Sequence, residues 1–168
     1  MQDKLRRRYQ VQKELSRNGK YQGVIAVSEM TRLISMLDSD QANISVVFEF
    51  LPSGFDYPML KGRVEASLAV ECQRCIKPVE LAMQFEFTLL VDAPDDLIQE
   101  TSLDTLYSVD GEIDLYEVVE DELILNLPLV ALHDDDSCNE YWRQPNEQAD
   151  VAIKVNPFSI LKELKTIN

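Results

Sequence analysis

Cysteine and histidine are rare in this chain of 168 residues, yet they fall into two close pairs. Cys72 and Cys75 form a C-x-x-C motif, and after 57 further residues His133 and Cys138 follow with an H-x4-C spacing. The chain has no other residue of either type. A structural zinc ion takes four ligands of this kind in a closed tetrahedron, and two short-spaced pairs can supply them. We therefore predict one structural Zn²⁺ site formed by these four side chains.

Two other interpretations of the cysteines remain open. Cysteine is one of the residue types found most often in protein cores, so its burial alone explains many examples. A thiol redox protein that uses Cys72 and Cys75 is a further alternative, although a redox C-x-x-C usually stands at the start of a helix. The odd number of cysteines does not suit a closed disulfide framework.

The elements that must position the ligands are two long strands. Apolar and polar residues alternate over residues 59–71 and again over 79–91, which is typical of strands with one wet face. The C-x-x-C lies between them, so we expect it in the turn of a long hairpin. A shorter alternation predicts a strand over 44–50, and Tyr21–Val27 is expected to form another.

Helical patterns flank these strands. We expect helices over 29–37 with Ser28 as the N-cap, over 115–127 with Asp114 as the N-cap, and over 158–164 near the C-terminus. A short strand is expected over 106–109. The predicted fold class is α+β: an antiparallel β-sheet built around a long hairpin, with several packed helices. We expect a basic helix or arm over 1–20 and a single α+β domain over 21–168.

Charge is distributed unevenly along the chain. Residues 1–37 carry eight basic and three acidic side chains, whereas residues 92–150 carry one basic side chain, Arg143, and eighteen acidic ones. The acidic segment should repel nucleic acid and attract a basic protein, or else serve solubility alone. The carboxylates Glu117, Glu120 and Asp121 are expected to form a solvated helix face.

The basic arm is a candidate RNA-binding surface. Its cations could contact phosphates while Tyr9 and Tyr21 stack on bases, and the alternative is that they pair with the protein's own carboxylates. Tyr141 and Trp142 form a candidate anchor for a protein partner, or a cover for the metal loop. The candidate RNA-binding residues are Arg6, Arg7, Arg8, Lys13 and Arg17.

The sequence gives little support for catalysis, and it shows no signal for secretion or membrane insertion. The chain has no P-loop, no G-x-G-x-x-G and no G-x-S-x-G motif, and no apolar run long enough to span a bilayer. No secretory signal follows the first residues, so we expect a cytoplasmic protein. We expect neither an enzyme nor a small-molecule substrate.

Several motifs together resemble one protein family. They are Val70–Cys75, Gly111–Leu115, Val119–Pro128, Leu132–Asp134 with Cys138, and Asn156–Leu161. In this order they are similar to the bacterial large ribosomal RNA subunit accumulation proteins, the YceD family. The resemblance implies a non-enzymatic factor in ribosome biogenesis that supports accumulation of large-subunit rRNA. Many members carry a second C-x-x-C after the histidine, where this chain has only Cys138.

Three hypotheses follow. In the first, the protein binds precursor large ribosomal subunits, with its basic arm on ribosomal RNA and its acidic segment on a basic ribosomal protein. The resemblance favours such a partner, because genes of the family often neighbour that of a small basic large-subunit protein. In the second, it is an acidic chaperone for a free basic ribosomal protein and has no RNA contact. The third is the thiol redox protein.

Overall fold

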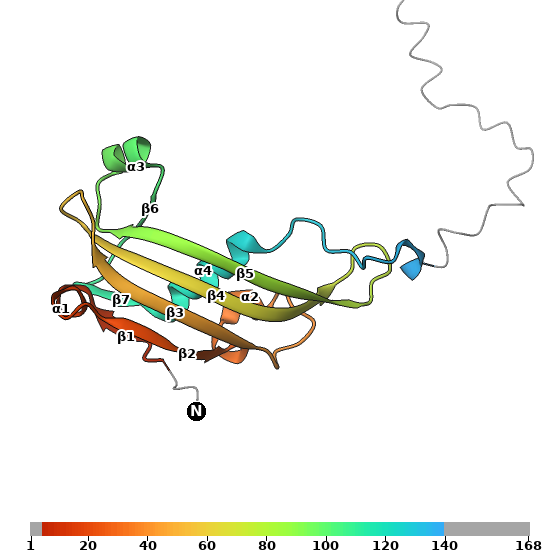
Figure 1. The fold of residues 1–168 in the computed structure, drawn as a ribbon. Helices are drawn as coiled ribbons and strands as arrows, with labels where there is room; N and C mark the ends of the chain where they lie inside the picture. The colour runs from red at the N-terminus through yellow and green to blue at the C-terminus, as the bar shows by residue number, and fades with distance from the viewer. Residues whose placement is uncertain (1–4, 140–168) are drawn as a thin grey trace, which may run out of the picture. The chain divides into compact units, whose positions relative to one another are not determined.

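The fold centres on a five-stranded sheet with the order β2-β3-β4-β5-β6. A computed structural model describes residues 5–139 of the chain (Figure 1). The strands are β2 (Lys20–Ala26), β3 (Asn43–Pro52), β4 (Pro58–Glu71), β5 (Pro78–Val91) and β6 (Asp104–Leu106). All neighbours are antiparallel except β5 and β6. The predicted α+β class and the long β4–β5 hairpin are confirmed.

A second, two-stranded sheet joins the N-terminus to the middle of the chain. Strand β1 (Arg8–Gln10) pairs antiparallel with β7 (Glu112–Asp114), so that Tyr9 lies opposite Ile113. Helix α1 (Val11–Ser16) follows directly. The basic arm is therefore a short strand and a short helix, and the strand was not expected from the sequence.

The longest of the described helices is one that the sequence predicts. Helix α4 (Leu115–Asn126) begins at Asp114, whose carboxylate accepts hydrogen bonds from the N–H groups of Tyr116 and Glu117, as predicted. The expected helix over 29–37 is instead a 3₁₀ turn (Val27–Glu29) followed by α2 (Thr31–Ile34). The predicted N-cap Ser28 is wrong, because the N-cap positions are Ala26 and Met30, and neither makes a side-chain capping bond. Helix α3 spans Asp95–Thr101. None of the described helices is long and apolar enough to cross a membrane.

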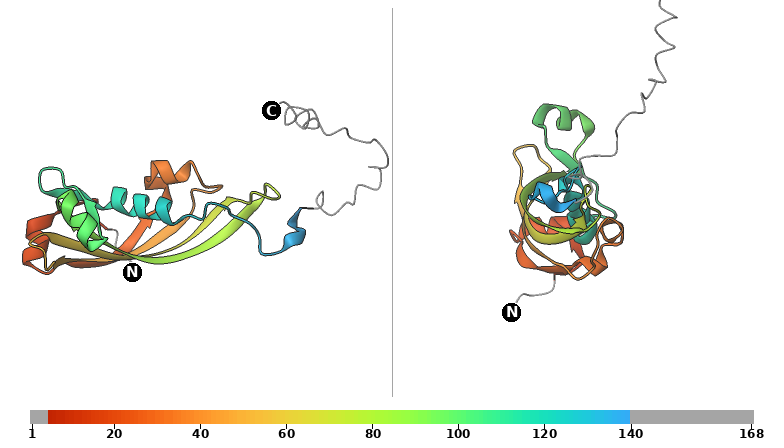
Figure 2. Two further views of the ribbon diagram at one scale, coloured as in Figure 1. Left: turned by 90° about the horizontal axis from the view of Figure 1, so that it is seen from above. Right: turned by 90° about the vertical axis from the view of Figure 1, so that its right-hand side faces the viewer.

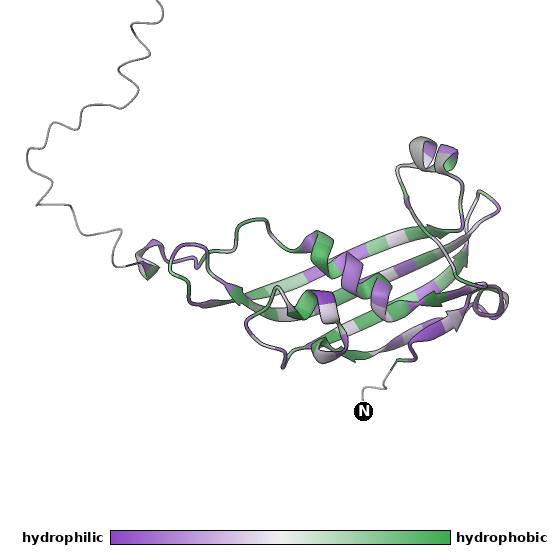
Figure 3. Cartoon of the chain, turned by 180° about the vertical axis from the view of Figure 1, so that it is seen from behind, coloured by the Kyte–Doolittle hydropathy of each residue, from purple (hydrophilic) through white to green (hydrophobic). Residues whose placement is uncertain are grey.

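One face of the sheet carries the core. Figure 2 shows α2 and α4 on the same side of the sheet, and Figure 3 shows apolar residues alternating with polar ones along the strands. Alternate residues of β3 (Ile44, Val46, Phe48 and Phe50) are buried, and Val119 and Leu123 of α4 belong to the same cluster. The alternation puts every second side chain on one face, so the strand pattern itself dictates this core.

By its internal contacts the chain divides into two units, residues 1–134 and 135–168. The described part of the second unit is a 3₁₀ turn over Asp136–Cys138, where the Asp135 side chain accepts a hydrogen bond from the Ser137 N–H. The helix expected over 158–164 lies outside the described residues.

Gly62 makes room for an aromatic ring in the middle of the sheet. It pairs with Phe48 on one side and Phe87 on the other, and a Cβ at this position would lie 2.2 Å from Phe87 Cζ. Since Phe87 is only 5% exposed, the ring has little space to move away.

We expect Gly62→Ala to lower the free energy of unfolding by about 1–3 kcal/mol, because the added methyl overpacks the site around Phe87. Urea denaturation would measure the loss. Gly54→Ala is the matched control, since a Cβ there meets nothing within 4 Å. Equal stability of the two variants would contradict the expectation.

Candidate metal centre

The turn of the β4–β5 hairpin holds both cysteines of the C-x-x-C motif. Strand β4 ends at Glu71 and β5 begins at Pro78. Two backbone bonds of 2.9 Å close the turn, from Cys72 N to the Lys77 carbonyl and from Ile76 N to the Cys72 carbonyl. Ile76 has a positive φ of 60°. The predicted placement of the knuckle in a hairpin turn is confirmed.

The segment that follows α4 lies along this turn. The backbone N–H of Gln73 donates to the Ala131 carbonyl at 2.9 Å, and its side-chain amide donates to the Leu129 carbonyl at 3.1 Å. Arg74 Nη2 donates to the His133 carbonyl at 3.2 Å. These bonds fix the segment 129–133 beside the hairpin. They explain how two motifs separated by 57 residues in the sequence become neighbours.

Three of the four predicted ligands form one group within the unit 1–134. Cys75 Sγ lies 3.4 Å from His133 Nδ1, and the ligand atoms of Cys72, Cys75 and His133 all lie within 4.8 Å of one another. Cys138, the fourth predicted ligand, belongs to the unit 135–168. Zinc bonds of about 2.0–2.3 Å place tetrahedral ligand atoms roughly 3.5–3.8 Å apart. The group therefore has the ligand types and the approximate spacing that a zinc ion needs.

The other nitrogen of His133 supports the same interpretation. Nε2 lies 3.0 Å from the Pro78 carbonyl oxygen, which can only accept a hydrogen bond. Nε2 therefore donates a hydrogen bond there, and Nδ1, on the side of Cys75, is the nitrogen that could bind a metal. Zinc-binding histidines commonly donate their second N–H to a carbonyl in this way, which fixes the ring orientation.

Cys72 is held in the form that binds metal. Its side chain is fully buried, and burial raises the pKa of a thiol. Hydrogen bonds to the sulfur from the backbone of Arg74, Cys75 and His133, together with the His133 side chain, outweigh burial and lower the pKa of Cys72 to about 5. A thiolate at neutral pH suits a metal ligand, and also a redox nucleophile. The complete burial of Cys72 leaves it inaccessible to a disulfide substrate.

The basic arm contacts the protein's own carboxylates at several points. Glu14, 1% exposed, accepts hydrogen bonds from Arg6 at 3.2 Å, from Arg17 at 2.7 Å and from the Tyr21 hydroxyl. Although burial raises the pKa of Glu14, these bonds outweigh it and keep that pKa below its usual value.

The other arm residues differ in their surroundings. Arg7 pairs with Asp114 at 2.7 Å. Arg8 and Lys13 are exposed, and no ion pair joins either to another residue within 5–139. The expected stacking of Tyr9 on RNA is wrong, because its ring is 2% exposed and packs against Phe48.

The acidic face expected on α4 is only partly solvated. Glu117 and Asp121 are exposed, but Glu120 is 5% exposed. Its carboxylate accepts hydrogen bonds from the backbone N–H groups of Arg32 at 2.7 Å and Leu33 at 3.0 Å, and from the Arg32 guanidinium at 2.9 Å. This role of Glu120 is not evident from the sequence, because helical spacing alone groups Glu120 with its exposed neighbours. The candidate partner residues Tyr141 and Trp142 lie outside the described residues.

Comparisons with known proteins agree with the resemblance described above. The family model "Large ribosomal RNA subunit accumulation protein YceD" matches residues 60–165. A protein of that name from Haemophilus influenzae is 33% identical over 163 residues, which cover 91% of this chain and 91% of the relative. No solved structure matches the chain significantly. The chain therefore belongs to the large ribosomal RNA subunit accumulation protein YceD family.

Proposed function

We propose that this protein supports the accumulation of large-subunit ribosomal RNA, acting by binding and not by catalysis, in the cytoplasm. Its membership in the YceD family carries the proposal, because the relative from Haemophilus influenzae bears that function in its name and matches nearly the whole chain. The site described above fits this role. A ligand set of three thiols and one imidazole, with one thiol fully buried, suits a structural ion better than a catalytic one.

We further propose that Cys72, Cys75, His133 and Cys138 hold one Zn²⁺. Such an ion would join the segment 129–133 to the β4–β5 turn and stabilise both. The thiolate state of Cys72 and the hydrogen bond from His133 Nε2 to the Pro78 carbonyl support zinc at this position. The thiol redox alternative has less support, since Cys72 is 0% exposed.

The binding partners follow from charge. The acidic segment 92–150 suits a basic ribosomal protein of the precursor subunit. RNA contact would come from Arg8 and Lys13, which are exposed and have no ion pair within residues 5–139. Arg6, Arg7 and Arg17 are less informative for a test, because their replacement would also break ion pairs with Glu14 or Asp114.

Cells that lack the protein should contain less large-subunit rRNA relative to small-subunit rRNA, and the wild-type chain should restore the ratio. In sucrose gradients of the same cells the tagged protein should sediment with precursor large subunits. Arg8→Gln combined with Lys13→Gln should weaken this association, since both changes remove phosphate contacts. Lys61→Gln combined with Lys77→Gln is the matched control, which loses the same charge elsewhere.

Three outcomes separate the hypotheses. An unchanged rRNA ratio would refute the proposed function. Co-sedimentation that both double variants retain in full would count against RNA binding by the arm. Recovery of a basic ribosomal protein after nuclease treatment, without any association with precursor particles, would favour the chaperone hypothesis.

A further inference from the structure

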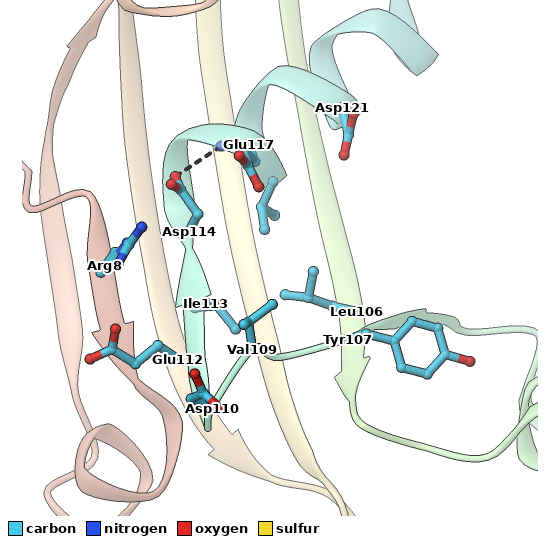
Figure 4. Close-up of a pocket in the computed structure, with 11 residues that line it drawn as sticks. Arg8, Leu106, Tyr107, Val109, Asp110, Glu112, Ile113, Asp114, Glu117 and Asp121 are labelled. Atoms are coloured by element: carbon cyan, nitrogen blue, oxygen red, sulfur yellow. Dashed lines mark hydrogen bonds between the residues drawn. The ribbon is translucent and has the colours of Figure 1, made fainter.

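A cavity lies beside the first turns of α4, apart from the cysteine and histidine group. Its volume is about 350 Å³, and its lining comes from β1, β7, α4 and the segment 106–110 (Figure 4). Figure 4 shows Glu112, Ile113 and Asp114 of β7 beside Arg8, with Glu117 and Asp121 on α4 and the Tyr107 ring directed away from β7. We call this cavity the acidic groove.

Negative charge dominates the lining of the acidic groove. Arg8 is its only cation, against five carboxylates: Asp110, Glu112, Asp114, Glu117 and Asp121. Three of these carboxylates already have polar partners, since Glu112 contacts Gln10, Asp114 pairs with Arg7, and Asp121 pairs with Arg32. The remaining two, Asp110 and Glu117, are exposed, and no ion pair joins them to other residues between 5 and 139. The groove thus offers carboxylates to a cationic partner.

Exposed apolar side chains line the same groove. Val109 is 75% exposed and Tyr107 is 63% exposed, whereas Ile113 and Val118 line it from the buried core. A single exposed apolar residue needs no explanation, but two that share a cavity with unpaired carboxylates indicate a binding surface. The partner should therefore present apolar side chains as well as positive charge.

One strand edge borders the groove. In the described part of the chain β6 pairs only with β5, so its other edge has no strand partner. The outer edge of β7 is occupied at Glu112, which forms a bridge with Val109 through backbone hydrogen bonds of 2.9 and 3.0 Å. Leu106 of β6 and residues 112–114 of β7 are both part of the lining. Free strand edges accept extended segments through main-chain hydrogen bonds, while pockets beside them select alternate side chains.

We propose that the acidic groove binds an extended basic segment of a protein partner, in which arginine or lysine alternates with apolar residues. The inference rests on the proposed function in taking a basic protein as the partner, and it adds where and how that protein binds. Cations would contact Asp110 and Glu117, and an apolar residue would lie against Val109 and Tyr107. RNA suits the groove poorly, because its phosphates would meet five carboxylates.

Fluorescence anisotropy with a short labelled peptide of alternating arginine and valine tests the proposal on the full chain. Asp110→Asn combined with Glu117→Gln should weaken binding about tenfold, since both changes remove charge and keep shape. The matched control is Asp56→Asn combined with Glu80→Gln, which should change affinity less than about twofold. Asp56 and Asp110 both have positive φ, 63° and 54°, which asparagine also tolerates. A peptide of alternating arginine and serine should bind the wild-type chain about fivefold more weakly.

Equal weakening by the two double variants would overturn the proposal, because charge alone would then explain binding. Equal affinity for the two peptides would do the same. An RNA oligonucleotide that binds the wild-type chain and loses affinity in the groove variant would show the groove to be an RNA site. These binding results are independent of the rRNA ratio measured in cells. The groove proposal can therefore be refuted while the proposed function still holds.

Discussion

Freshly purified wild-type protein should contain close to one zinc ion per chain, and Cys75→Ser should lose it. The expectation rests on the ligand atoms of Cys72, Cys75 and His133, which lie within 4.8 Å of one another, and on a histidine ring already oriented by the Pro78 carbonyl. Since zinc binding contributes to folding free energy, removal of the ion should lower the melting temperature by about 5 °C or more. Elemental analysis by mass spectrometry and thermal denaturation with and without a chelator would measure both effects.

The control for the zinc prediction is Ser137→Ala, which changes the residue beside Cys138 and keeps all four ligands. Cys138→Ser should lose zinc as Cys75→Ser does, and His133→Asn should behave alike. Full zinc binding by Cys138→Ser would reduce the site to three protein ligands. Wild-type protein that contains no metal directly after purification would end the zinc proposal.

Glu120→Ala should lower the free energy of unfolding by about 2–4 kcal/mol, a large effect for one helix residue. The carboxylate is 5% exposed and accepts hydrogen bonds from the N–H groups of Arg32 and Leu33, the second and third residues of helix α2. Its loss would leave the buried Leu33 N–H without an acceptor. Urea denaturation would measure the change. Glu117→Ala in the same helix should cost about 0.5 kcal/mol or less, because Glu117 is exposed.

The effect of Glu120 should depend on pH. Burial raises the pKa of this carboxyl, but hydrogen bonds from the Leu33 and Arg32 backbone and from the Arg32 side chain outweigh burial and lower the pKa. A lowered pKa in the folded state means that the carboxylate stabilises the protein above the unfolded pKa of about 4.3 and loses this effect as the pH falls through the folded pKa. The stability gap between wild type and Glu120→Gln should thus be widest near neutral pH and shrink below about pH 4. A gap that stays constant down to low pH would contradict this assignment.

The sequence predicted the parts of the fold whose signals are local. Alternation over two long segments identified the β4–β5 hairpin, and the position of Asp114 before an apolar helix identified its N-cap. The scarcity of cysteine and histidine pointed to the candidate metal ligands, because few combinations were available.

The missed features depend on distant partners. Strand β1 has three residues and pairs with β7 more than a hundred positions away. Three residues are too few to show the alternation of apolar and polar side chains that predicts a strand. Glu120 is acidic and has the same helical spacing as its exposed neighbours. It becomes a buried hydrogen-bond acceptor because α2 packs beside α4 and directs the Leu33 N–H at its carboxylate. The acidic groove likewise joins segments whose adjacency follows from the β1–β7 pair and the start of α4.

The pairing of β1 with β7 also has a consequence for the order in which the chain is made. Strand β1 leaves the ribosome early in synthesis, but its partner strand is complete only when Asp114 has been added. The Leu5 carbonyl likewise accepts a hydrogen bond from the Tyr116 hydroxyl, which is synthesised 111 positions later. Closing so long a loop is slow compared with local folding. Until then Tyr9 has no strand opposite it and Arg7 has no carboxylate at Asp114. A nascent chain that ends before residue 112 therefore presents Arg7 without its carboxylate partner, whereas the finished protein pairs Arg7 with Asp114.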